Sequence, residues 1–170
     1  MFNCLVKSNK GIPFISAIEL RPLPDENYNV GDYSLALIWR YDIGQTAKQY
    51  RYPSDLHDRL WYPFDRDDWT QLNTSLSSTT EDNSYQVPSI VMCTAATPKN
   101  AEDSLNIFWL PSDSNAQYHI YVHFAEVEKL QANESRQFNI TFNREPFYGP
   151  SSPGYMSATT IYSREAWSPT

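Results

Sequence analysis

The residues best suited to chemistry lie in an aromatic stretch that runs from Tyr50 to Trp69, which we call the aromatic loop. The candidate ligand-binding residues in it are Tyr52, Asp55, Trp61 and Tyr62. Their aromatic faces and carboxylate form the mixture that stacks on sugar rings or clamps a peptide. The structural alternative is that Trp61 fills the core while Arg59 pairs with a nearby carboxylate and holds the loop. We favour this alternative for Arg59 and Trp61 and leave both interpretations open for Tyr52 and Tyr62.

Two histidines, His119 and His123, have a spacing that suits a shared metal only on a helix. They lie instead in residues 117–130, where apolar residues alternate with period two, as expected of a half-buried strand. On a strand their Cα atoms are roughly 13 Å apart, which is too far for joint ligation. We therefore expect no metal at this pair.

No other motif predicts catalysis, a cofactor or a metal. The acidic turn Asp65-Arg66-Asp67-Asp68 lacks the glycine and the final glutamate of a calcium loop. The chain also lacks a P-loop, a dinucleotide-binding glycine motif, a nucleophile elbow and the commonest zinc-protease motif. We expect no enzyme. A carboxylate pair for glycoside hydrolysis stays open, because its separation is set in three dimensions.

Charge and composition limit the partners. The 170 residues carry a net charge of −7, so nucleic acid and anionic membrane surfaces should repel the chain. Its longest apolar run, Leu35 to Trp39, is far shorter than the roughly 18 residues of a membrane helix. The first twenty residues lack the apolar core of a signal peptide. Two cysteines, Cys4 and Cys93, decide neither a disulfide nor a metal site.

Aromatic content of 15% and strand-like alternation favour an all-β fold, in the form of an antiparallel β-sandwich or jelly roll. The expected strands are Phe2 to Val6, Phe14 to Leu20, Tyr33 to Tyr41, Pro88 to Ala96, Leu105 to Leu110, residues 117–124, Arg136 to Asn143 and Met156 to Ser163. Asn73 to Ser84 is expected to be an exposed loop, and Gly149 to Gly154 a turn.

Three sequons make Asn73, Asn133 and Asn139 candidate glycosylation sites. Chance alone yields roughly two in a chain of this composition, so their number is no evidence for secretion. Two lie in expected loops, and Asn139 points away from the apolar face of its strand.

Several stretches, in order along the chain, resemble the malectin-like domain of plant leucine-rich-repeat receptor-like kinases. They are Cys4 to Val6, Pro13 to Leu23, Asp42 to Gly44, Arg51 to Asp55, Asp58 to Trp61, Tyr85 to Pro88, Val91-Met92, Thr94 to Ala96, Tyr121 to Glu128 and Phe147 to Pro150. The resemblance implies two similar β-sandwich lobes in tandem. Residues 1–24 are expected to end the first lobe and residues 25–170 to form most of the second, which makes the domain incomplete.

The resemblance also implies a function, which is ligand recognition outside the cell as part of a full-length receptor. The expected ligand is a cell-wall saccharide or a glycosylated partner. The alternative is a docking module that binds a secreted peptide or a co-receptor without sugar. A carbohydrate-active enzyme, or its accessory domain, is a third hypothesis.

Overall fold

The computed structural model describes residue 16 and residues 27–31, 34–75, 84–111 and 113–168. The strands expected at Phe2 to Val6 and Phe14 to Leu20 lie outside the described residues, Ser16 aside. Cys4 lies outside them as well.

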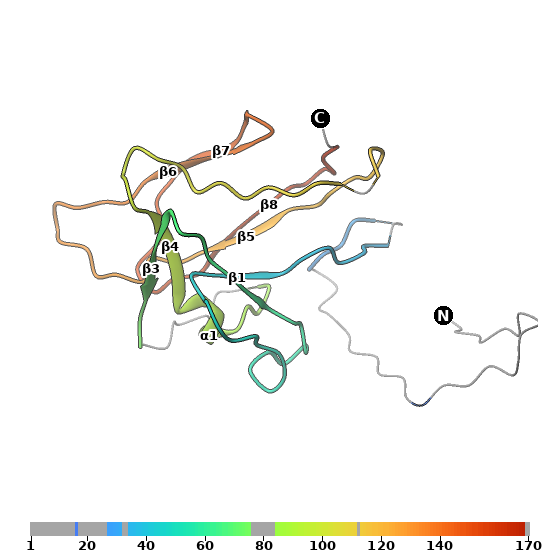
Figure 1. Cartoon of the computed structure of the whole chain (residues 1–170), viewed down its shortest axis with the longest axis horizontal. Coiled ribbons are helices and arrows are strands. Elements are labelled where there is room, and N and C mark those ends of the chain that lie inside the picture. The colour runs from blue at the N-terminus through green and yellow to red at the C-terminus, as the bar shows by residue number, and fades with distance from the viewer. Residues whose placement is uncertain (1–15, 17–26, 32–33, 76–83, 112, 169–170) are drawn as a thin grey trace, which may run out of the picture.

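Short strands dominate the described part of the chain, which contains one helix (Figure 1). In chain order they are β1 (Tyr41–Ile43), β2 (Tyr62–Phe64), β3 (Trp69–Asn73), α1 (Ser89–Met92), β4 (Thr94–Pro98), β5 (Tyr121–Phe124), β6 (Phe138–Phe142), β7 (Glu145–Ser151) and β8 (Thr159–Tyr162). The all-β prediction is confirmed.

The strands pair two by two. β3 with β4, β5 with β8, and β6 with β7 are antiparallel, as the sequence predicts. β1 and β2 are parallel. The segment between them, which includes the first part of the aromatic loop, returns the chain to the starting end of β1 before β2 begins. In Figure 1, β5 and β8 run side by side through the middle of the fold, and β3 and β4 stand beside α1.

The sequence predicts the first strand of the β6–β7 hairpin but not the second. Phe138, Ile140 and Phe142 are half-buried and alternate with exposed residues, as predicted. β7 replaces the turn expected at Gly149, and the hairpin turns earlier, at Asn143 and Arg144, which have φ of 49° and 70°. The irregular register of the pair accommodates the prolines of β7, which would not fit a regular central strand.

Three strand predictions were wrong in whole or in part. Residues 34–40 belong to no strand, and β1 begins only at Tyr41. The stretch from Pro88 to Ala96 divides into α1 and the start of β4. Leu105 to Leu110 is neither a strand nor interior, since Phe108 is 76% exposed. An apolar run alone does not distinguish an interior strand from an exposed extended segment.

The core forms where α1 and the segment before it pack on the aromatic loop. Its buried members are Trp61, Tyr85, Val87, Val91 and Met92. Tyr28, Tyr50, Tyr121, Ala125 and Ala158 pack around them. Residues far apart in sequence therefore meet on one aromatic cluster, and one side of this cluster reaches the surface.

Candidate ligand-binding hollow

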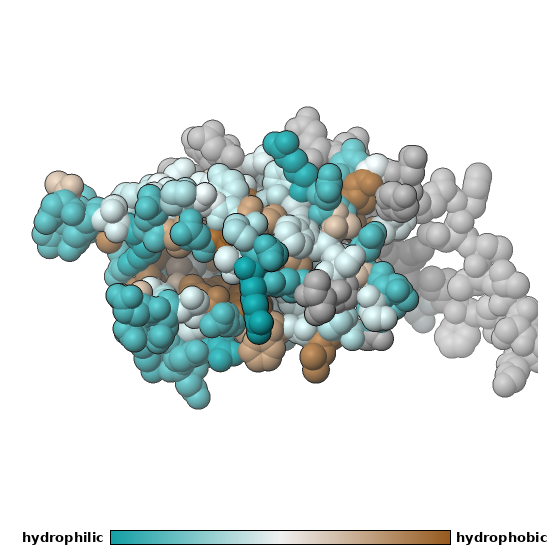
Figure 2. All heavy atoms as spheres, turned by 90° about the horizontal axis from the view of Figure 1, so that it is seen from above, coloured by the Kyte–Doolittle hydropathy of each residue, from teal (hydrophilic) through white to brown (hydrophobic). Residues whose placement is uncertain are grey.

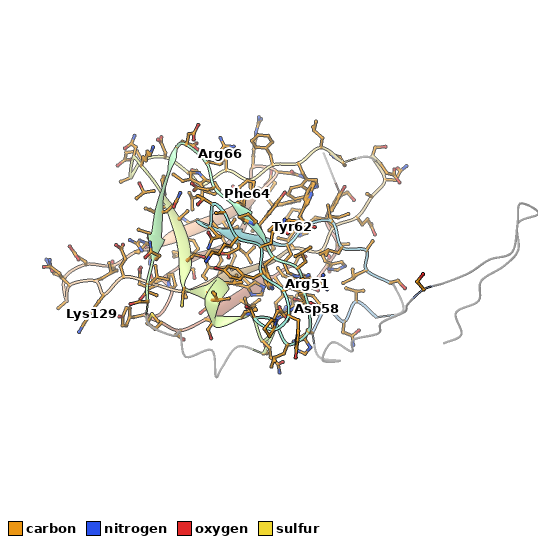
Figure 3. All side chains as sticks on the ribbon, turned by 60° about the horizontal axis from the view of Figure 1, so that its bottom comes forward. Arg51, Asp58, Tyr62, Phe64, Arg66 and Lys129 are labelled. Atoms are coloured by element: carbon orange, nitrogen blue, oxygen red, sulfur yellow. The ribbon has the colours of Figure 1, made fainter. Side chains whose placement is uncertain are left out.

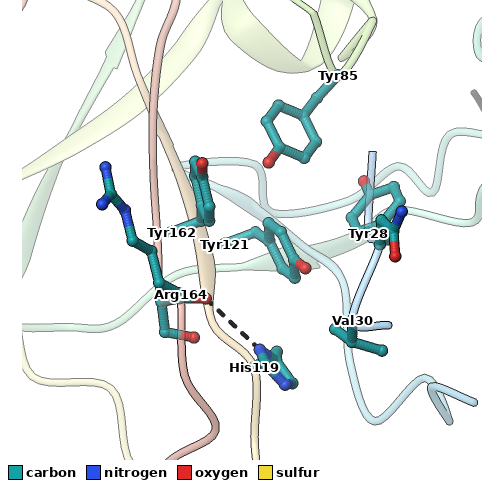
Figure 4. Close-up of a pocket in the computed structure, with 9 residues that line it drawn as sticks. Tyr28, Val30, Tyr85, His119, Tyr121, Tyr162 and Arg164 are labelled. Atoms are coloured by element: carbon teal, nitrogen blue, oxygen red, sulfur yellow. Dashed lines mark hydrogen bonds between the residues drawn. The ribbon is translucent and has the colours of Figure 1, made fainter. Parts of the chain in front are cut away.

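Four tyrosines surround a hollow of about 110 Å³, which we call the tyrosine hollow (Figure 4). Its lining residues are Tyr28, Asn29, Val30, Tyr85, His119, Tyr121, Tyr162, Ser163 and Arg164. None of these described lining residues is acidic, although the chain as a whole is acidic.

The antiparallel pair of β5 and β8 supplies one wall. Tyr121 and Tyr162 are direct register partners, and their rings stack 6.0 Å apart at an angle of 13°. Just beyond them, Ser163 accepts a hydrogen bond at Oγ from the Ile120 amide at 2.9 Å and donates its own amide to the Ile120 carbonyl. These bonds hold the strand ends together, so the two rings are fixed relative to each other.

Tyr28 and Tyr85 supply the opposite wall. The Tyr85 ring lies 5.6 Å from that of Tyr121, and the Tyr28 ring lies 4.8 Å from Tyr121 at a steep angle. Burial and the neighbouring phenols raise the pKa of Tyr85 to about 12, and burial raises the pKa of Tyr121. Both hydroxyls therefore keep their protons at neutral pH and can donate hydrogen bonds to a ligand.

A buried ion pair positions the Tyr85 wall from behind. Arg59 donates from Nε to Asp55 Oδ2 at 2.7 Å and from Nη1 to the Tyr85 carbonyl at 2.7 Å. It also donates to the carbonyl of Gln86 and, at 3.3 Å, to the hydroxyl of Tyr28. One guanidinium thus holds both Tyr85 and Tyr28, so the hollow depends on it.

The four predicted ligand-binding residues do not form one surface. Tyr52 and Tyr62 are 57% and 39% exposed, whereas Asp55 and Trp61 are buried. Trp61 donates from Nε1 to Asp55 Oδ2 at 2.8 Å, so these two residues hold each other inside the fold. The structural interpretation of Arg59 and Trp61 agrees with this geometry. Ligand contact by the two exposed tyrosines stays a prediction.

The rim of the aromatic loop is tied by a second, exposed ion pair. Arg51 donates from Nε to Asp58 Oδ1 at 2.8 Å, and the two side chains lie together in Figure 3. Asp58 also accepts from the Tyr52 amide at 3.0 Å. Tyr52 is therefore presented to solvent on a held backbone.

Of the two histidines, His123 lies in β5 and His119 lies just before it. His123 faces the core, and its Nδ1 lies 2.8 Å from Thr160 Oγ1. Burial lowers the pKa of His123 to about 4, with Arg59 and Arg40 acting in the same direction, so it is neutral. His119 instead lines the tyrosine hollow. No group of three or more metal-ligating side chains occurs among the described residues.

The sequence contained a signal for the hollow. Tyr121 and His119 fall on the strand side opposite Val122, and both line the hollow. Tyr28 and Tyr85 had no such signal, because only the packing of distant segments brings them there. The candidate glycosylation residues Asn73, Asn133 and Asn139 are all exposed.

The acidic turn forms a wide, shallow depression of about 540 Å³ lined by Asp65, Arg66, Asp67 and Asp68. Within it Arg66 donates from Nε to Asp68 Oδ1 at 3.0 Å, so part of its charge is already paired. It offers no aromatic lining. The tyrosine hollow is the better candidate for ligand recognition.

Comparisons with known proteins agree with one another. A family model described as the malectin-like domain matches residues 3–169. The probable LRR receptor-like serine/threonine-protein kinase At1g51820 of Arabidopsis thaliana is 44% identical over 93% of this chain. The LRR receptor-like serine/threonine-protein kinase IOS1 of the same plant is 38% identical over 94%. The chain spans only 18% of each of these relatives. No solved structure matches it.

Proposed function

This chain belongs to the malectin-like domain family, and we propose that it is the ligand-recognition part of a leucine-rich-repeat receptor-like kinase, on the extracellular side of the plasma membrane. The matched domain is not catalytic, and the kinase activity named for the relatives belongs to those longer proteins. Within the described residues, no helix is both long and apolar enough to cross a membrane. We assign residues 1–24 to the end of a first lobe and residues 25–170 to a second.

The proposed ligand is a saccharide ring held in the tyrosine hollow. The observation that carries this proposal is the meeting of four tyrosines around a small open space. Tyrosine faces pack against the C–H faces of a sugar, while phenol hydroxyls, His119 and Asn29 supply polar partners for its hydroxyls. Tyr52 and Tyr62 offer further exposed aromatic faces on the aromatic loop.

Protein docking is the second candidate function, and a different observation favours it. Two extended segments, residues 34–39 and 104–110, expose large apolar side chains that we call the apolar ridge. Its exposed members are Leu35, Leu37, Ile38, Trp39, Leu105, Ile107, Phe108 and Leu110. The ring centroids of Trp39 and Trp109 are 5.9 Å apart, so the two segments are in contact. Figure 2 shows a face of the molecule that is mainly hydrophilic, with hydrophobic side chains in small groups. Exposed apolar surface of this kind suits a secreted peptide or a co-receptor.

A matched pair of variants tests the saccharide proposal. Tyr162 lines the hollow and is 46% exposed, while Tyr155 is 45% exposed and lies outside it. Tyr162→Ala should weaken binding of plant cell-wall oligosaccharides by about tenfold, or ~1.4 kcal/mol, whereas Tyr155→Ala should leave it unchanged. Tyr62→Ala tests the aromatic loop in the same titration, and unchanged affinity would remove Tyr62 from the site.

The assay is isothermal titration calorimetry, with circular dichroism to confirm that each variant is folded. Equal affinities for the Tyr162→Ala and Tyr155→Ala variants would refute the hollow as the site. Docking is favoured instead if no oligosaccharide binds the parent chain while a secreted peptide or co-receptor ectodomain does. In that case Phe108→Ser, at a residue 76% exposed, should abolish binding.

A further inference from the structure

A buried carboxyl, Asp42 in β1, has no role in the recognition proposed above. Its side chain is fully buried, and Thr94 Oγ1 at the start of β4 lies 2.6 Å from its Oδ1. Its second oxygen, Oδ2, is buried and has no hydrogen-bond partner in the part of the chain that the structure describes. An ionised carboxylate in this position would leave several lone pairs unsatisfied, at a considerable cost in free energy.

The Thr94 hydroxyl has two neighbours and a single proton. Besides Asp42 Oδ1, it lies 3.1 Å from the carbonyl oxygen of Val91 in α1. A carbonyl only accepts, and an ionised carboxylate only accepts, so one proton cannot satisfy both. If Asp42 carries a proton on Oδ1, it donates to Thr94 Oγ1, and Thr94 donates to Val91. Both contacts are then hydrogen bonds.

We propose that Asp42 is held as a neutral carboxylic acid whose proton completes a hydrogen-bond chain to Thr94 and Val91, and that loss of this proton loosens the junction of β1, β4 and α1. This hydrogen-bond chain links β1, β4 and α1. The packing of β1, β4 and α1 therefore depends on pH.

Among the described residues, no charged group offers Asp42 a second partner. The end of β1 packs so closely on β4 that a Cβ on Gly44 would lie 2.2 Å from the carbonyl oxygen of Ala95. No charged residue occurs in β2, β4 or α1. The adjoining titratable groups are Tyr41 on the same strand, Tyr62 in β2 and Cys93 before β4, all of types that are neutral when protonated. Arg40 lies over the Trp61 ring at 5.4 Å.

The expected titration follows this geometry. Burial raises the pKa of Asp42 to about 6 from an ordinary 3.8. The folded chain therefore binds this proton more tightly than the unfolded chain does. The stability contributed by the group is complete below pH 4 and is lost as pH rises to about 6.

The Asp42→Asn variant tests the hydrogen-bond chain, because the asparagine amide donates to Thr94 as the protonated acid does. At pH 4 the variant and the parent should unfold in urea with similar equilibrium constants. At pH 7.5 the ratio of folded to unfolded protein should be about 100-fold higher for the variant than for the parent. The reason is that the pKa shift of roughly two units corresponds to a factor of ten for each unit. Asp103→Asn, at an exposed carboxylate, is the matched control and should show no such trend.

A ratio between the Asp42→Asn variant and the parent that stays within threefold from pH 4 to pH 7.5 would overturn the proposal. A second measurement uses the parent chain and does not depend on the stability of any variant. The carboxyl ¹³C shift of Asp42 in the native 170-residue chain should titrate near pH 6. A midpoint near pH 4 would show that the carboxyl loses its proton as an exposed aspartate does, which contradicts the hydrogen-bond chain.

Discussion

Replacing Arg59 by methionine should destabilise the chain by about 3 to 5 kcal/mol, the usual cost of removing one partner from a buried ion pair. Arg59 is 5% exposed and Asp55 is 1% exposed, so water cannot replace the lost donor without opening the fold. The methionine has similar length and keeps much of the packing against Trp61. The loss is therefore mainly electrostatic and polar.

The magnitude follows from the contacts that Arg59 makes. Its removal leaves Asp55 Oδ2 with one donor, Trp61 Nε1, where it had two. It also removes the donors to the carbonyls of Tyr85 and Gln86. Each buried acceptor left without a donor costs about 1 to 3 kcal/mol, and the charged one costs more. Partial access of water at the Gln86 end keeps the total within the range given.

The assay is urea unfolding followed by tryptophan fluorescence. The internal control is the pair of Arg51 and Asp58, in which the arginine side chain is 60% exposed and the aspartate side chain 10%. Arg51→Met should cost about 1 kcal/mol, because solvent reaches the guanidinium and screens its charge. Adding Asp55→Asn to Arg59→Met should recover part of the loss, since it removes the unpaired buried charge. A cost below about 1 kcal/mol for Arg59→Met would refute the assignment of Arg59 as the anchor of the hollow.

Two further predictions concern packing. Val122→Asp should lower stability by several kcal/mol, because Val122 lies directly opposite buried Ile161 and an aspartate there would be an unpaired charge; a thermal midpoint within a degree of the parent would contradict this. Gly44→Ala should cost clearly more than Gly31→Ala in the same thermal unfolding assay. Both glycines have positive φ, but a Cβ at Gly44 meets the Ala95 carbonyl at 2.2 Å and one at Gly31 meets nothing within 4 Å. Equal midpoints for the two variants would show that β1 does not pack tightly on β4.

The sequence succeeded where local pattern and local chemistry agree. Alternation in residues 138–142 predicted the half-buried face of β6. The sequence also favoured a structural role for Arg59 and Trp61, and the structure places both inside the fold. The family resemblance, carried by motifs spread over the chain, is confirmed by the family model that covers residues 3–169.

Other predictions failed because apolar character does not specify what lies next to a segment. Leu105 to Leu110 has the composition of an interior strand, yet Leu110 is 92% exposed. The turn expected at Gly149 and Pro150 became part of β7, because an irregular register with β6 admits residues that a regular strand would exclude. Neither outcome depends on the local sequence alone.

By itself, the sequence determined the all-β class and the family, since composition, alternation and motif order are local properties of the chain. Only the tertiary structure decided which aromatic and polar residues meet. Asp55 and Trp61 turned inward because their polar atoms pair with each other there, while Tyr28, Tyr85, Tyr121 and Tyr162 gathered from segments up to 134 positions apart. The hollow and the unpaired oxygen of Asp42 are products of packing over long sequence separations, which no local pattern encodes.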